Sequence, residues 1–189
     1  MLPLLEIAYA LRGLWRLVHL DPRGLEYFDR SVAGFWRSFR VALLVAPAEA
    51  LLYAGAIQDL KTHASWERLI LVEILSYVVG WMVFPVAAYE LARRMNRTTE
   101  YVGYIVVYNW SAIVGYSLFL LASVPHAAGL ASAGVGDALS HLGYLVFLGY
   151  LWFLARSALA LDGVAAAGFV LLDFGLTMIL SVVTASMIA

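Results

Sequence analysis

The chain has 189 residues, of which 63% are hydrophobic and only 13% are charged, and its formal net charge is −1. Soluble domains carry about 25% charged residues, so this composition excludes an ordinary soluble fold and indicates a membrane protein. The balanced charge argues against nucleic-acid binding, and the absence of cysteine excludes disulfides, thiol catalysis and cysteine-ligated metals.

Residues 1–36 are predicted to form an amphipathic segment that is cytoplasmic or lies at the membrane interface. Between residues 3 and 20, apolar side chains recur at helical spacing, with Arg12 and Arg16 on the opposite face. The apolar positions are Leu4, Ile7, Leu11, Leu14, Trp15 and Val18. Such a helix either lies in the membrane interface, where Arg12, Trp15 and Arg16 would contact lipid, or packs on the end of the helix bundle; periodicity alone does not separate the two. Its charges argue against a secretory signal peptide.

Two helix-start signals follow the helix predicted over residues 3–20. Asp21 and Pro22 supply an N-cap and a first helical residue, and Ser31 supplies a second candidate cap. The second signal precedes a short stretch that runs through Phe35 and Trp36 into the first apolar span.

Five stretches of the chain are long enough to cross a bilayer, which requires about 20 predominantly apolar residues. They cover residues 37–57, 69–91, 101–123, 138–160 and 164–187. The first is the weakest, because Pro47 and Glu49 lie near its middle and Arg40 near its start. The predicted fold is therefore all-α, a polytopic bundle of five transmembrane helices within residues 37–189.

The basic residues between these spans fall almost entirely on one side of a five-span bundle. Six arginines precede residue 41, three more lie at 93–97 and Arg156 ends the fourth span, whereas only Lys61 and Arg68 fall on the other side. The positive-inside rule then places the N-terminus in the cytoplasm and the C-terminus outside. The excess of arginine over lysine, with abundant alanine, leucine and glycine, indicates a bacterial protein. The predicted location is the bacterial inner membrane, with a periplasmic C-terminus.

Charged side chains at the centre of a spanning helix cost roughly 2.5–3.5 kcal/mol each on insertion scales, so each one needs a reason. Asp173 lies about ten residues, or about 15 Å, into the fifth span and heads a stripe of small and polar residues, Thr177, Ser181 and Ala185. It is either a proton or cation site, or a carboxyl held by a neighbour's hydrogen bond or by small-residue packing. Arg156 either extends to the cytoplasm or neutralises Asp173.

Glu49 is the second candidate for an intramembrane site. It follows Pro47 by two residues, and a proline inside a helix frees the carbonyl four residues before it, here that of Leu43. A kinked helix with a nearby carboxylate is a recurring way to build a site at mid-membrane depth, and kinks also occur for packing alone. Asn109 lies at a depth from which it could reach either carboxylate, whereas Glu73, near the outer end of the second span, is less informative.

The sequence contains no evident catalytic, metal-binding or cofactor-binding constellation. The four histidines are scattered, and no Gly-x-Ser-x-Gly motif is present. Residues 134–137 resemble the Gly-x-Gly-Asp motif of intramembrane aspartyl proteases, which pair two aspartates at one depth. Asp137 falls at the outer end of the fourth span, about 15 Å from the depth of Asp173. We therefore predict a protein without enzymatic activity or cofactor.

The layout of the chain resembles the bacterial branch of the Yip1-like membrane proteins. The features that carry this resemblance are a cytoplasmic segment before five spans, Phe84-Pro85 in the second span and Tyr108-Asn109-Trp110 in the third. The Asp-Leu-Tyr-Gly-Pro signature of the eukaryotic members is absent. The resemblance implies a membrane protein that works through partners without catalysis, and it carries over no catalytic residues.

Two functions are consistent with the sequence. The first is a non-catalytic scaffold or accessory subunit of a membrane complex, which fits the small size and the interfacial N-terminus. The alternative is a small proton- or cation-coupled transporter or channel that uses Glu49, Asn109 and Asp173. The expected partners are the lipid bilayer and either other membrane subunits or a second copy, because five spans leave no room for an inverted repeat within one chain.

Overall fold

The computed structural model describes residues 4–58, 64–127, 130 and 132–188, so Lys61 lies outside the described residues. Within these ranges every regular element is a helix, which confirms the predicted all-α fold. Five of the described stretches are long and apolar enough to cross a membrane: Val32–Ile57, Trp66–Arg94, Thr98–Ser123, Gly134–Ala158 and Gly163–Ile188. They agree with the five predicted spans to within a few residues at each end.

The N-terminal part of the chain consists of three short helical elements: α1 (Leu4–Val18), the 3-10 helix η1 (Pro22–Tyr27) and α2 (Val32–Ser38). Both predicted start signals act as caps. The Asp21 carboxylate accepts a hydrogen bond from the Arg23 N–H at 3.1 Å, and Ser31 Oγ accepts one from the Gly34 N–H at 3.1 Å. These side chains satisfy backbone donors that have no partner within the first turn of a helix.

The first span is broken into two helices. α2 ends at Ser38, and α3 (Val41–Gln58) continues the chain. At the junction, the N–H groups of Ala42 and Leu43 each bond to a carbonyl three residues back at 3.1 Å, which tightens the turn between the two helices. α3 then runs through Pro47 without ending there.

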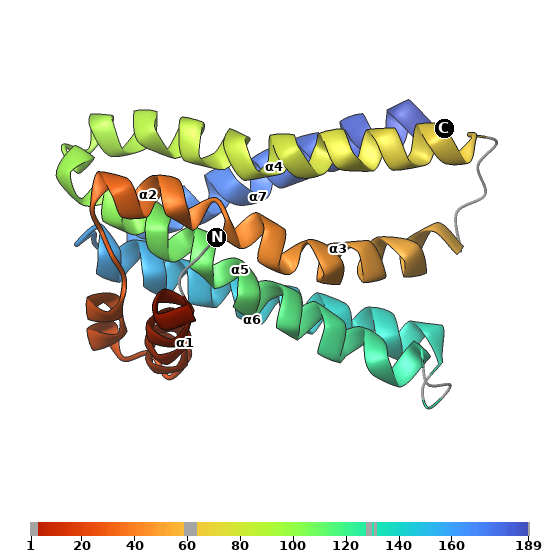
Figure 1. Cartoon of the computed structure of the whole chain (residues 1–189), viewed down its shortest axis with the longest axis horizontal. Coiled ribbons are helices and arrows are strands. Elements are labelled where there is room, and N and C mark those ends of the chain that lie inside the picture. The colour runs from red at the N-terminus through yellow and green to blue at the C-terminus, as the bar shows by residue number, and fades with distance from the viewer. Residues whose placement is uncertain (1–3, 59–63, 128–129, 131, 189) are drawn as a thin grey trace.

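The other spanning helices are α4 (Trp66–Arg94), α5 (Thr98–Ala127), α6 (Ala133–Ala158) and α7 (Gly163–Ile188). α4 packs along α7 and α5 packs along α6, while α3 packs on α5 (Figure 1). α3 and α4 pack little against each other, and side-chain hydrogen bonds join them instead. Tyr77 Oη donates to the Ala42 carbonyl at 2.6 Å, and Tyr53 Oη donates to the Leu69 carbonyl at 3.1 Å. This arrangement leaves space between α3 and α4.

Tight packing is concentrated toward one end of the bundle. The large, fully buried side chains there include Trp110 of α5, Leu154 of α6 and Phe169 of α7, and α1 adds Leu17. Toward the other end, the buried hydrophobic residues among the described positions form a small cluster of Leu69, Val72 and Ile188. The bundle is therefore well filled at one end and more open along the rest of its length.

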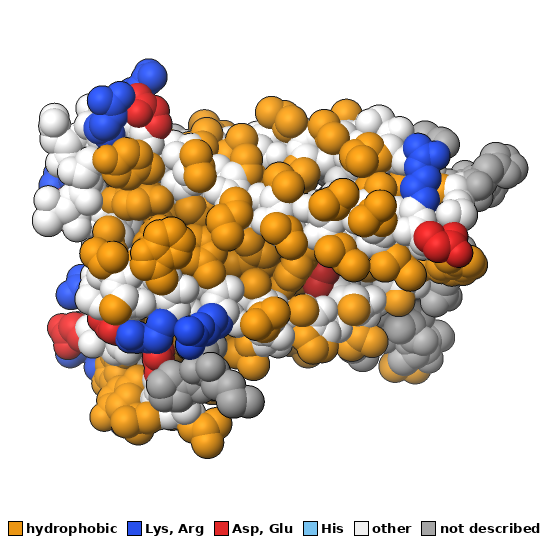
Figure 2. All heavy atoms as spheres, turned by 45° about the horizontal axis from the view of Figure 1, so that its top comes forward, with side chains coloured by type: hydrophobic (Ala, Val, Ile, Leu, Met, Phe, Trp, Pro, Cys, Tyr) orange, Lys and Arg blue, Asp and Glu red, His pale blue; other side chains and the backbone are white. Residues whose placement is uncertain are grey.

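The well-packed end also carries most of the arginines, and we call it the Arg-rich end. The arginines lie in or beside α1, η1 and α2 and at the ends of α4, α5 and α6: Arg12, Arg16, Arg23, Arg30, Arg37, Arg40, Arg93, Arg94, Arg97 and Arg156. Arg68 lies at the opposite end, near the start of α4. Figure 2 shows the basic side chains gathered mainly at one end, with hydrophobic side chains along the spans between the two ends.

Candidate functional site

A cavity of about 600 Å³ lies between α3, α4, α5, α6 and α7. Three acidic side chains line it, Glu49 of α3, Glu73 of α4 and Asp173 of α7. Its described lining includes serine and threonine hydroxyls but no lysine, arginine or histidine. On the face drawn in Figure 2, an acidic side chain is visible among the hydrophobic side chains of the spans. The fold thus brings the two carboxyls that the sequence singles out, together with Glu73, into one space.

Asp173 is held by a tyrosine. Tyr108 Oη donates a hydrogen bond to Asp173 Oδ1 at 2.6 Å. Each residue lies ten positions beyond the first residue of its helix, and both helices start at the Arg-rich end, so the pair lies about 15 Å along the bundle. Asp173 Oδ2 has no hydrogen-bond partner among the described residues. One carboxylate oxygen is therefore fixed by the protein, and the other is available to a ligand.

Glu49 and Glu73 form a second acidic group in the cavity wall. Their carboxyls interact across the space between α3 and α4, and Tyr77 and Tyr116 lie beside Glu49. Both glutamates are half-buried. Like charges at close range repel strongly where the dielectric constant is low, and a proton or a cation held between the two carboxyls would relieve that repulsion.

The two acidic groups are spaced along one face of α5. Tyr108 and Tyr116 are eight residues apart, which corresponds to about 12 Å along a helix. Asp173 and Tyr108 form the inner cluster, nearer the Arg-rich end. Glu49, Glu73 and Tyr116 form the outer cluster.

Asn109 also lines the cavity and is only 1% exposed. Ser38 Oγ donates its one proton to the Phe35 carbonyl at 2.7 Å, so it must act as acceptor for Asn109 Nδ2, which lies 2.9 Å away. This fixes the orientation of the amide, and Asn109 Oδ1 is left buried without a partner. Asn109 thus binds Ser38 and neither carboxyl, and it presents an unused acceptor.

Arg156 lies apart from the cavity. Its side chain is exposed at the Arg-rich end of α6, with the guanidinium 5.5 Å from the centre of the Trp152 ring. Arg156 is not among the described residues that line the cavity and forms no ion pair with Asp173, which instead accepts from Tyr108, so Arg156 does not neutralise it. Asp137 is exposed near the start of α6 and is not among the described lining residues, so it forms no aspartate pair with Asp173.

The polar stripe predicted on α7 faces the cavity. Thr177, Ser181 and Ala185 all line it. One position before Ala185 on the same helix, the Thr184 hydroxyl shares a hydrogen bond with Ser76 of α4 at 2.5 Å. These small side chains allow α4 and α7 to approach and supply hydroxyl groups to the cavity wall.

Sequence reasoning did not identify the tyrosines of α5 as part of this site. Tyr108 and Tyr116 line the cavity and recur, together with the buried Tyr104, at multiples of four residues, which places the three near one helix face. That spacing was a usable signal, because a tyrosine hydroxyl at mid-membrane depth needs a polar partner. No such signal marked Glu73 as part of the site, because its place there depends on the packing of α3, which brings Glu49 close to Glu73.

The N-terminal helices form a separate polar cluster at the Arg-rich end. The Arg12 and Arg16 guanidinium groups lie 5.6 and 5.8 Å from the centre of the Tyr27 ring, and Arg16 Nε donates to Asp21 Oδ2 at 3.0 Å. Both arginines therefore contact η1, while the Trp15 side chain is 69% exposed. α1 packs on the bundle through one face and leaves a second apolar face uncovered.

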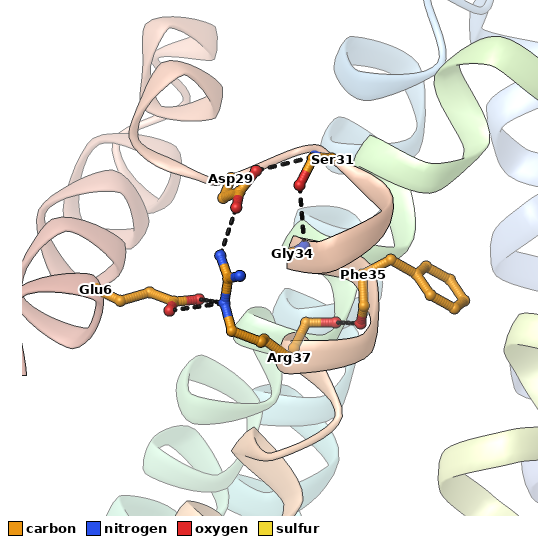
Figure 3. Close-up of polar contacts among 7 residues, drawn as sticks. Glu6, Asp29, Ser31, Gly34, Phe35 and Arg37 are labelled. Atoms are coloured by element: carbon orange, nitrogen blue, oxygen red, sulfur yellow. Dashed lines mark hydrogen bonds and ion pairs between the residues drawn. The ribbon is translucent and has the colours of Figure 1, made fainter. Parts of the chain in front are cut away.

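An ion-pair network joins α1 to α2 (Figure 3). Arg37 Nε donates to Glu6 Oε2 at 3.1 Å, and Arg37 Nη2 donates to Asp29 Oδ2. Hydrogen bonds from the Ser31 side chain and backbone, with a further contribution from Arg37, hold the pKa of Asp29 below its ordinary value of 3.8 despite the opposing effect of burial. Asp29 is therefore ionised at neutral pH and anchors Arg37.

The fold and the cavity define a class: a five-span helical membrane bundle with an acidic, aromatic-lined space between its helices. Among the described residues, no group of three or more His, Asp or Glu side chains converges to hold a metal ion. Comparison with protein-family models, with characterised protein sequences and with solved structures gives no match for this chain. The Yip1-like resemblance remains a prediction from the sequence.

Proposed function

We propose that the protein is a non-catalytic integral membrane protein of the bacterial inner membrane that binds cations in its acidic cavity as a step in proton- or cation-coupled transport. One observation carries this proposal: Glu49, Glu73 and Asp173, from three different helices, line one cavity whose described wall holds no basic side chain. Ionisable side chains within spanning helices are costly, and those that face an internal cavity commonly mark ion pathways.

The distribution of arginine supports an orientation for such a protein. Ten arginines lie at the Arg-rich end, and Arg68 is the basic residue described at the other end. The positive-inside rule places the Arg-rich end and the N-terminus in the cytoplasm. The inner cluster then lies nearer the cytoplasm and the outer cluster nearer the periplasm, and a second copy of the chain would supply the rest of a transport pathway.

The test is a flux assay on the purified full chain in proteoliposomes that contain a pH-sensitive dye, with an imposed sodium or potassium gradient. We expect gradient-driven proton movement that Glu49→Gln and Asp173→Asn each largely abolish. Asp173→Asn keeps an acceptor for the Tyr108 hydroxyl, so the fold should be retained. Glu67→Gln is the matched control, because Glu67 is exposed in the first turn of α4. Absence of flux, or equal flux in all variants, would contradict the proposal.

A second candidate function is the scaffold or accessory subunit. It is favoured by the uncovered apolar face of α1, where Leu4, Leu11 and Trp15 are 85%, 47% and 69% exposed outside the spans. Such a face suits a partner subunit as well as the membrane interface. Native mass spectrometry of the protein extracted in a mild detergent tests it: a stoichiometric foreign subunit supports this function, and a homodimer or monomer alone counts against it.

A further inference from the structure

Resting on the proposed cation-binding function, we infer that the cavity takes an organic cation with an apolar body, such as a hydrophobic amine or a quaternary onium ion, in place of a bare metal ion. The inference concerns the chemical class of the ligand and is carried by the size of the cavity, by its aromatic wall and by an unused buried acceptor.

The first argument is size. Small-molecule sites generally occupy about 300–1,000 Å³, and the cavity of about 600 Å³ lies within that range. A bare metal ion is instead held by several oxygen atoms that converge at about 2.0–2.6 Å from it. The carboxyls here are divided between an inner and an outer cluster, and the described residues contain no converging set of metal ligands. The space therefore suits a molecule and not a single atom.

The second argument is the aromatic wall. Aromatic side chains from α4, α5 and α6 line the cavity: Tyr77, Trp81, Phe84, Tyr108, Tyr116, Phe119, Tyr144 and Phe147. Several of them pack against one another, with ring centres 6.1 Å apart for Phe119 and Tyr144 and 4.3 Å apart for Phe84 and Tyr108. Aromatic faces attract organic cations through cation–π interactions and also bury apolar surface. A strongly hydrated inorganic ion would gain little from such a wall.

The third argument is independent of the carboxyls. Asn109 is one of the residues that line the cavity, and its Oδ1 is buried with no hydrogen-bond partner among the described residues. Leaving such an acceptor unsatisfied costs about 1–3 kcal/mol. A protonated amine carries N–H donors for an acceptor of this kind and a positive charge for the Asp173 carboxyl, whose Oδ2 is also unused. An amine would use both acceptors, whereas a quaternary onium ion, which has no N–H donor, would use the carboxyls and the aromatic wall.

Binding of radiolabelled tetraphenylphosphonium to the full chain in detergent tests this inference. Tetraphenylborate has the same shape and the opposite charge, and therefore serves as the matched probe for hydrophobic partitioning. We expect saturable binding of the cation, at least roughly tenfold weaker binding of the anion, and a similar loss of cation affinity in Glu49→Gln and Asp173→Asn. Glu67→Gln should bind like the wild type, and size-exclusion profiles should show that all variants remain folded.

The possible outcomes separate this inference from the proposed function. Equal binding of the two probes, or cation binding that none of the carboxyl substitutions weakens, would overturn the inference by showing simple partitioning into an apolar space. Carboxyl-dependent proton flux in the proteoliposomes without any binding of the phosphonium cation would also overturn it, while the proposed transport of small cations would stand.

Discussion

Tyr108 makes a direct polar contact with the intramembrane carboxyl of Asp173. Its hydroxyl donates at 2.6 Å, and the ring packs between Phe84 and Tyr104. Tyr108→Phe keeps the ring and removes only the donor, so we expect a loss of about 0.5–2 kcal/mol in unfolding free energy, the range for hydrogen bonds between membrane helices. The measurement is reversible unfolding in mixed detergent micelles followed by circular dichroism. Tyr9→Phe is the control, since Tyr9 is an exposed residue of α1; equal stability of the two variants would show that the hydrogen bond contributes nothing.

Asp29 gives the Arg-rich end a defined pH dependence. Because its folded-state pKa lies below the ordinary 3.8, it stabilises the fold at higher pH, and that stabilisation is lost as the pH falls below about 4 through the folded-state pKa. Asp29→Asn should therefore lower the thermal midpoint at pH 6, and the difference from the wild type should shrink steadily toward pH 3. A difference that is constant with pH would mean that the charge of Asp29 plays no part in holding Arg37.

At the scale of a single helix, the start of α2 depends on a glycine. A Cβ placed at Gly34 would lie 1.9 Å from the Asp29 carbonyl oxygen, which is backbone and cannot rotate away. Gly34→Ala should force the loop before α2 to shift, with a cost of about 1–3 kcal/mol or more. Gly55→Ala in α3 is the matched control, because no atom lies within 4 Å of its added Cβ and alanine is the better helix former. Thermal unfolding of both variants checks this, and equal midpoints would contradict it.

The helices themselves were largely predictable, because a run of about 20 apolar residues leaves few alternatives in a membrane. The caps at Asp21 and Ser31 were also readable, since each signal is local. The break between α2 and α3 was not predictable from the sequence. The turn there is made by backbone hydrogen bonds to carbonyls three residues back, and neither glycine nor proline lies at the junction. Pro47, which the sequence does mark, lies inside α3 and does not end it.

For the whole molecule, the cavity depends on which helices are neighbours, and hydropathy does not determine that. Asp173 and Glu49 were recognised from their charge within a span and from local features, the polar stripe after Asp173 and Pro47 before Glu49. Their placement in one space follows from α4 packing on α7 and α3 packing on α5. The same arrangement brings Glu73 to Glu49. Charged residues within spans can thus be found from the sequence, while the grouping of those residues into a site requires the three-dimensional packing.

The orientation of the whole bundle can be tested directly, because the chain has no cysteine and single-cysteine variants need no prior substitution. Glu67 and Arg94 are exposed and lie at opposite ends of α4. With the Arg-rich end in the cytoplasm, Glu67→Cys should react with a membrane-impermeant maleimide in intact spheroplasts, and Arg94→Cys should react only after the membrane is opened. The reverse pattern would place the Arg-rich end outside. The inner cluster would then face the periplasm, so the order in which a cation meets the two acidic clusters would be inverted while the cavity itself stayed the same.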